Sequence, residues 1–247
     1  MKYPLVKPRY YISLLLDLLN FIRQPTPHTA GDKTTQMKIC DMLGLYVLKM
    51  VLLIPVVLFF ALVYDPENIQ GARMADRFSP WALLLVGGFI LPLVEEVAFR
   101  LSLKFKPGYL ALTISVITYY LLTKWVFLTK ISAVDESFVL RVAISLSAGL
   151  VLFPLISQRR IKKVLTWFWA HQFRWIYYAC CLIFAWIHIG KYELIPLNLL
   201  LMPILTLPQL ISAMIYGYTR VSFGFQYPLM LHVTNNVLGI TLSFLAT

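Results

Sequence analysis

The sequence predicts an all-α fold, a polytopic transmembrane helical bundle of about seven spans with amphipathic helices at the membrane interface. Of its 247 residues, 60% are apolar and only 13% are charged, and the mean hydropathy is +0.75. A soluble domain needs a more polar surface than this composition supplies. Because a spanning helix takes about 20 residues, seven spans use more than half of the chain and leave no room for a separate soluble domain.

Apolar windows separated by charged or turn-forming segments define the expected spans. Backbone groups in lipid must be hydrogen-bonded within their own segment, so each window is expected to be helical. The windows are Met42 to Tyr64, Pro80 to about Leu103, Gly108 to Thr129, Phe138 to Ser157, Trp175 to Ile189, Ile195 to Tyr218 and Phe225 to Ala246.

Residues 1–41 are expected to form a cytoplasmic and interfacial segment before a single transmembrane domain at 42–247. The apolar stretch from Tyr10 to Ile22 contains Asp17 and is followed by no small-residue cleavage site, which favours an amphipathic surface helix over a signal peptide. Without a targeting segment, the expected location is a bacterial cytoplasmic membrane, and an endoplasmic reticulum membrane stays open as the alternative.

A second stretch, residues 159–173, combines apolar residues at helical spacing with four cations and two tryptophans. Two interpretations remain open: an interfacial helix, or a basic loop that only sets orientation. The residues concerned are Ile161, Val164, Leu165, Phe168, Arg159, Arg160, Lys162, Lys163, Trp167 and Trp169.

The formal charge of +11 is explained by membrane orientation. The basic residues are scattered through apolar sequence and form no basic, aromatic-interleaved domain, so no nucleic-acid partner is expected. A cytoplasmic N-terminus places fifteen cations on the inside and five on the outside, in agreement with the positive-inside rule. The inside group is Lys2, Lys7, Arg9, Arg23, Lys33, Lys38, Arg100, Lys104, Lys106, Arg159, Arg160, Lys162, Lys163, Arg174 and Arg220; the outside group is Arg73, Arg77, Lys124, Lys130 and Lys191.

Ionisable residues inside membrane spans are costly and therefore mark candidate functional sites. The first candidate motif, Glu95-Glu96-xxx-Arg100, ends an apolar run. Glu96 and Arg100 are four residues apart and share a helical face, which predicts an ion pair. Glu95 is rotated away and is free to take a proton from water. The alternative is that both glutamates only pair with cations at the membrane boundary.

Two further motifs carry histidines on other apolar helices. Phe184 precedes His188 by one helical turn and is expected to pack against its ring. His232 and Asn236 are four residues apart, so both side chains could donate hydrogen bonds to a developing oxyanion. Taken singly, His188 is more simply a packing residue, and the pair at 232 and 236 could be interhelical polar contacts.

In this order the three motifs resemble the pattern EExxxR, FxxxH, HxxxN of the CPBP intramembrane proteases, also called the CAAX-protease or Abi family. The resemblance covers roughly Pro80 to Arg100 and Tyr177 to Ala246 and implies an endopeptidase acting on a membrane-associated or lipidated substrate. It also implies that Glu95 and His188 activate water, that His232 and Asn236 form the oxyanion site, and that Glu96, Arg100 and Phe184 support them.

The chain departs from the family pattern in the spacing of its motifs. His188 lies about ninety residues beyond Glu96, which predicts an inserted helical hairpin at 108–157. Simple span assignment also places Glu95 and His232 in the cytoplasmic half of the membrane but His188 near the far end of its helix. Helix tilt, or a helix that begins within residues 159–173, could bring the three residues to one depth, and the sequence leaves both alternatives open.

Motifs of other intramembrane proteases are absent from the sequence. The histidines are His28, His171, His188 and His232, so no HExxH motif occurs, and no GxSxG motif is present. No cofactor is expected, although zinc held by Glu95, His188 and His232 is an alternative. A transporter predicts internal repeats that are not visible. A non-catalytic scaffold or bacteriocin-immunity protein with the same fold remains open.

Overall fold

The computed structural model describes residues 4–27 and 33–245. All regular elements in these residues are helical, which confirms the predicted fold class. Lys2, His28, Ala246 and the side chain of Arg73, which enter the predictions above, lie outside the described parts. The elements are η1 (Pro4–Val6), α1 (Pro8–Arg23), α2 (Thr35–Leu62), α3 (Ile69–Ala75), α4 (Pro80–Leu85), η2 (Val86–Ile90), α5 (Leu91–Phe99), η3 (Leu101–Leu103), α6 (Pro107–Leu121), η4 (Leu122–Val126), α7 (Phe138–Ser157), α8 (Arg159–Trp186), η5 (Ile187–Lys191), α9 (Pro196–Leu200), α10 (Met202–Leu205), α11 (Leu207–Ser222) and α12 (Gln226–Leu245).

Six helical stretches of the described chain are long and apolar enough to cross a membrane. Their outward faces carry large exposed apolar side chains, such as Val57 on α2 and Leu150 on α7. Such faces are stable where lipid replaces water as the solvent. The chain is therefore an integral membrane protein. The stretches are Thr35–Leu62, Pro80–Leu103, Pro107–Val126, Phe138–Ser157, Arg159–Lys191 and Gln226–Leu245.

The expected sixth span, Ile195 to Tyr218, is not one helix. It is broken into α9, α10 and α11, each with a proline in its first turn: Pro196, Pro203 and Pro208. Proline lacks the backbone N–H that an inner helical turn needs, and it is favoured where a helix begins. The window is apolar in sequence, but its prolines divide it into three helices.

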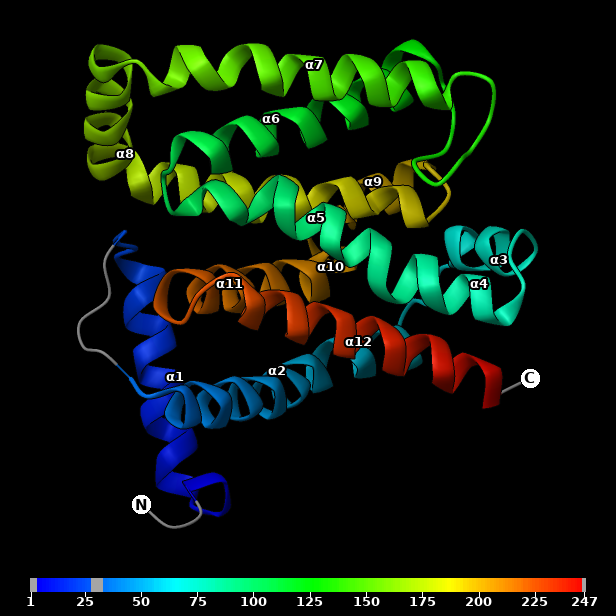
Figure 1. Cartoon of the computed structure of the whole chain (residues 1–247). Coiled ribbons are helices and arrows are strands. Elements are labelled where there is room, and N and C mark those ends of the chain that lie inside the picture. Colours follow the sequence, from blue (N-terminus) through cyan, green and yellow to red (C-terminus); the bar gives the residue numbers. More distant parts are fainter. Residues whose placement is uncertain (1–3, 28–32, 246–247) are drawn as a thin grey trace.

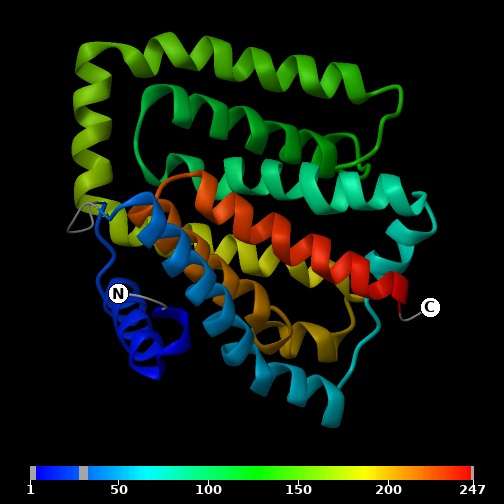
Figure 2. The same cartoon turned by 60° about the horizontal axis from the view of Figure 1, so that its bottom comes forward.

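Two helices cross one end of the bundle, which is called here the α1 end. Figures 1 and 2 show α1 and the first part of α8 running across the direction of the long helices. The stretch 159–173 is thus helical and continuous with the following span, so its interpretation as a loop is wrong. The start of α2, which begins at Thr35 rather than at Met42, lies at the same end, as do the α5–α6 and α11–α12 connections.

Helices α6 and α7 form an antiparallel pair on one side of the bundle, within the expected hairpin at 108–157 (Figures 1 and 2). Gly149 allows them to approach closely. A Cβ atom at this position would lie 2.0 Å from the Ser115 hydroxyl oxygen and 3.1 Å from the Ala111 carbonyl oxygen. Small residues at helix contacts are typical of packing in membranes.

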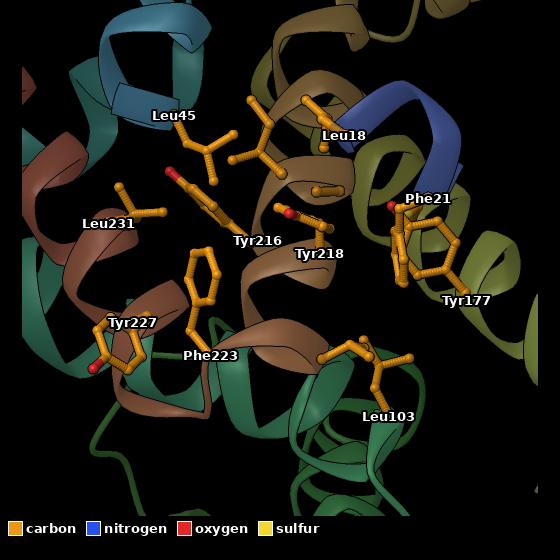
Figure 3. Packing of buried hydrophobic residues seen from close by; sticks show 14 of the residues in the cluster. Leu18, Phe21, Leu45, Leu103, Tyr177, Tyr216, Tyr218, Phe223, Tyr227 and Leu231 are labelled. Atoms are coloured by element: carbon orange, nitrogen blue, oxygen red, sulfur yellow. The ribbon is translucent and has the colours of Figure 1, made fainter. Parts of the chain in front are cut away.

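The main core joins α1, α2, α8, α11 and α12. Figure 3 shows Phe21, Leu45, Tyr177, Tyr216 and Leu231 within this cluster, and all five side chains are buried. The Phe21 ring meets the Tyr177 ring edge to face at a centroid distance of 5.2 Å. The predicted surface helix α1 is therefore anchored to the bundle by one apolar face.

Candidate active site

The first motif lies on a span that contains a π-helical turn, η2. The Leu91 N–H donates to the Val86 carbonyl rather than to that of Gly87, its partner in a regular α-helix. The freed Gly87 carbonyl accepts a hydrogen bond of 3.0 Å from Nδ2 of Asn236 on α12. The π-helical turn thus allows a hydrogen bond between the helix of the first motif and Asn236 of the third motif.

Glu96 is fully buried, and its carboxylate contacts Arg100 and His232. Its Oε1 lies 3.2 Å from Nη1 of Arg100, which confirms the expected ion pair, and 2.8 Å from Nδ1 of His232. The Arg100 guanidinium stacks 3.7 Å from the centroid of the Phe184 ring. Such a cation–π contact is strongest away from water. Glu96 therefore has a second partner that the sequence did not predict.

His232 stands between the two adjacent glutamates. Because a carboxylate only accepts, Nδ1 of His232 donates its proton to Glu96. Its Nε2 faces Glu95, with 3.6 Å between Nε2 and Oε2. When Nε2 carries a proton, it can donate a hydrogen bond towards Glu95 or towards a ligand in its place.

His188 lies on η5, where the backbone changes from α-helix to 3₁₀-helix after Trp186. Its Nδ1 is 2.6 Å from the Phe184 carbonyl oxygen, which can only accept, so this nitrogen carries a proton. In the neutral ring, Nε2 is then an acceptor. The Phe184 ring packs against His188 at a centroid distance of 4.7 Å, as the sequence predicted.

One cavity of about 630 Å³ joins these groups. Its lining includes the candidate residues Glu95, Phe184, His188, His232 and Asn236. The expected mismatch in depth is therefore wrong, because His188 reaches the same cavity as Glu95 and His232. The reason is that α8 begins across the end of the bundle and enters it late, so residue counting misplaced its depth (Figure 1).

The cavity has a buried end and an exposed end. His232 and Tyr216 line the buried end, whereas the exposed residues Asn68, Gly71 and Ser243 line the other. Gly71 belongs to α3, which lies at the end of the bundle opposite to α1 (Figures 1 and 2). The reactive groups thus lie within the bundle and are reached from the end opposite to α1.

Three lining residues escaped the motif analysis: Lys49 on α2, Tyr216 on α11 and Asn235 on α12. The Lys49 ammonium donates to the Tyr216 hydroxyl over 3.3 Å and to Oδ1 of Asn235. The Tyr216 ring packs on His232 at a centroid distance of 5.3 Å. A cation within an apolar window was itself a signal for Lys49, whereas no pattern pointed to Tyr216 or Asn235.

Glu95, His188 and His232 are the side chains that could hold zinc at this site. Glu95 and His232 offer two donor atoms 3.6 Å apart. In the described parts of the chain, however, no three His, Cys, Asp or Glu side chains are grouped so that they could hold a metal ion. A catalytic zinc site has three protein ligands, and zinc held by Glu95, His188 and His232 stays an alternative for experiment to decide.

A scan against protein-family models, a search of curated proteins and a search of solved structures each gave no significant match. The function must therefore be argued from the geometry of the site.

Proposed function

We propose that this protein is an intramembrane endopeptidase of the CPBP type that hydrolyses a peptide bond in a membrane-associated or lipidated substrate. One observation carries the proposal: Glu95, His188 and His232, from three distant parts of the chain, line the same cavity. A carboxylate and two imidazoles at one partly hydrated site are the groups that water activation needs. If these residues served only as polar contacts between helices, they would not need to line one common cavity.

In the proposed reaction, Glu95 and Nε2 of His188 orient a water molecule and take one proton as its oxygen attacks the carbonyl carbon. The proton then passes to the leaving amine nitrogen as the C–N bond breaks. His188 is suited to this role because the Phe184 carbonyl holds the proton on Nδ1 and leaves Nε2 as the acceptor.

The proposed oxyanion site consists of Asn236 and His232, and the two residues differ in the hydrogen bonds that they can donate. Asn236 has one N–H engaged by Gly87 and one remaining for the substrate. His232 donates from Nε2 only when this nitrogen is protonated, and Glu95 lies next to it. Glu96 and Arg100 fix the His232 ring through its other nitrogen.

The proposed location is a bacterial cytoplasmic membrane with the N-terminus inside. This orientation is supported by the basic segments that share the α1 end. The cavity then opens towards the opposite side, so the substrate enters from the non-cytoplasmic face or from the surrounding lipid.

Cleavage can be tested without knowledge of the substrate. Purified protein in liposomes is incubated in H2(18O) with a degenerate library of N-palmitoylated peptides, and the products are identified by mass spectrometry. Hydrolysis places one 18O atom in each new carboxyl group. The wild-type protein is expected to release labelled products, whereas Glu95→Gln and His188→Ala release none above background. Equal labelling by all three proteins would sink the peptidase proposal and favour the scaffold or immunity protein.

The proposed reaction uses no metal, and a chelator provides the matched test. Activity is expected to survive dialysis against a strong chelator. Complete loss that is restored by zinc, but not by magnesium, would overturn the metal-free mechanism while leaving peptide hydrolysis intact.

A further inference from the structure

Lys49 is buried at the inner end of the cavity, with only 1% of its surface exposed. It is the buried cation of α2, which also carries the partly exposed Lys38, and its ammonium contacts a helix on either side through Tyr216 of α11 and Asn235 of α12. These two acceptors use two of its three N–H donors. The third N–H is available to the cavity that Lys49 lines.

This ammonium has no carboxylate partner within 4.0 Å among the described residues, in contrast to two other buried cations. Arg100 pairs with Glu96, and Arg141 pairs with Asp135. Tyr216 and Asn235 give Lys49 only neutral oxygens, and the rings of Tyr46 and Tyr216 lie 5.3 and 5.5 Å from Nζ. A buried charge without a counter-ion is costly, so an anion in the cavity would be strongly favoured here.

Lys49 also lies close to the proposed reaction centre. Lys49 and His232 both contact the Tyr216 ring: Nζ of Lys49 lies 5.5 Å from the ring centroid, and the centroid of the His232 ring lies 5.3 Å from it. A group bound to Lys49 would therefore belong to the substrate near the scissile bond rather than to a distant part of it.

We propose that Lys49 is a specificity-determining residue that binds a carboxylate of the peptide substrate close to the scissile bond; this inference rests on the proposed function. A single ammonium with one free N–H suits a monovalent carboxylate, whereas a phosphate group with its larger charge calls for several donors or a bidentate arginine. The carboxylate belongs either to the C-terminus of the peptide or to an acidic side chain.

The test compares the N-palmitoylated library made with free C-terminal carboxylates and the same library made with C-terminal amides. If Lys49 binds the C-terminal carboxylate of the peptide, the wild-type protein should prefer the acid library. If Lys49 binds an acidic side chain instead, aspartate or glutamate should be enriched near the cleavage points of both libraries. Loss of a charge-assisted hydrogen bond in Lys49→Gln should lower either preference at least about tenfold. Lys49→Arg should retain part of it.

A second measurement keeps binding separate from cleavage. In Glu95→Gln protein, the thermal unfolding midpoint is followed with each library, since a ligand that binds only the folded state raises it. The preferred carboxylate-bearing peptides should raise the midpoint more than matched amides, and Lys49→Gln in the same background should remove this difference. If the wild-type protein cleaves neither library, the peptidase proposal fails while this binding difference still tests Lys49.

Lys191 provides the matched control, because it lines the same cavity from η5. Lys191→Gln is expected to keep the preference for carboxylate-bearing peptides. The inference is overturned if the wild-type protein shows no such preference in cleavage or in binding, if Lys49→Gln retains it in full, or if Lys191→Gln removes it. A purely structural Lys49 would lower the unfolding midpoint without changing the preference.

Discussion

Arg141 and Arg100 are both almost completely buried, with 0% and 2% of their surfaces exposed, and they differ in how their guanidinium groups are satisfied. All three nitrogens of Arg141 donate hydrogen bonds. By contrast, Nη1 and Nη2 of Arg100 have no hydrogen-bond acceptor among the described residues, and Oε2 of Glu96 is likewise unpaired. The acceptors around Arg141 are Ser137 Oγ, Tyr119 Oη, Thr123 Oγ1, the Ala133 carbonyl oxygen and Asp135 Oδ1, at 2.9 to 3.1 Å.

Arg141 thus has the complete hydrogen bonding of a structural network, whereas the Arg100 cluster retains unsatisfied polar atoms. Arg141 on α7 links Thr123, near the end of the α6 span, to Asp135 in the following loop, and every nitrogen of its guanidinium group donates a hydrogen bond. The Arg100 cluster lies beside Glu95 and His232, where the proposed reaction requires groups to change protonation or partner. Unsatisfied buried polar groups are rare in stable cores and are expected where function requires them. The predictions below test this distinction.

The largest expected effect is on catalysis at Glu95. Glu95→Gln keeps the shape of the side chain but removes its ability to take a proton, so the hydrolysis rate should fall by about 10²- to 10⁴-fold. The unfolding midpoint should remain close to that of the wild-type protein. A rate within twofold of wild type would place Glu95 among the merely structural residues.

Its neighbour Glu96 gives a matched comparison. Glu96→Gln leaves Arg100 as a buried charge without its partner and weakens the bond to His232, so it should lower both activity and stability. Breaking a buried ion pair costs about 3–5 kcal/mol, which predicts reduced protein level and a lower unfolding midpoint. If Glu96→Gln changed neither protein level nor midpoint, the supporting role of this ion pair would be wrong.

A smaller effect on stability alone is expected at Arg141. Arg141→Met fills a similar volume but removes the hydrogen bonds that join Thr123 to Asp135, and lost bonds of this kind cost about 1–3 kcal/mol. The unfolding midpoint should fall, while hydrolysis per folded molecule stays at the wild-type value. A specific loss of catalysis would contradict the structural assignment of this network.

The smallest effect concerns acid stability in the α6–α7 connection. Hydrogen bonds from Ser137 and Thr129, with help from Arg141, lower the pKa of Asp135 from its usual 3.8 to about 2. A depressed folded-state pKa contributes stability that is fully present above the usual pKa and is lost as pH falls through the folded-state value. Between pH 4 and 2, the wild-type midpoint should therefore lose an increment that Asp135→Asn lacks. Parallel curves for the two proteins would contradict this contribution.

The helical class, most of the spans and the ion pair between Glu96 and Arg100 were predictable from the order of the residues alone. Apolar windows of sufficient length must be helical in lipid, and a four-residue spacing places two side chains on one helical face. These are local constraints, which can be read from neighbouring residues. The same reasoning missed the division of Ile195 to Tyr218, because hydropathy weighs apolarity and not the prolines within it.

Contacts between residues that are distant in the sequence could be known only from the folded chain. The depth of His188 depends on where α8 enters the bundle, the second partner of Glu96 depends on how α12 packs against α5, and the contacts of Lys49 depend on helices far away in the sequence. Packing between helices is set by side-chain shape and close approach over long separations, and no local spacing encodes it. The sequence therefore supplied the chemical groups, and the fold arranged them around one cavity.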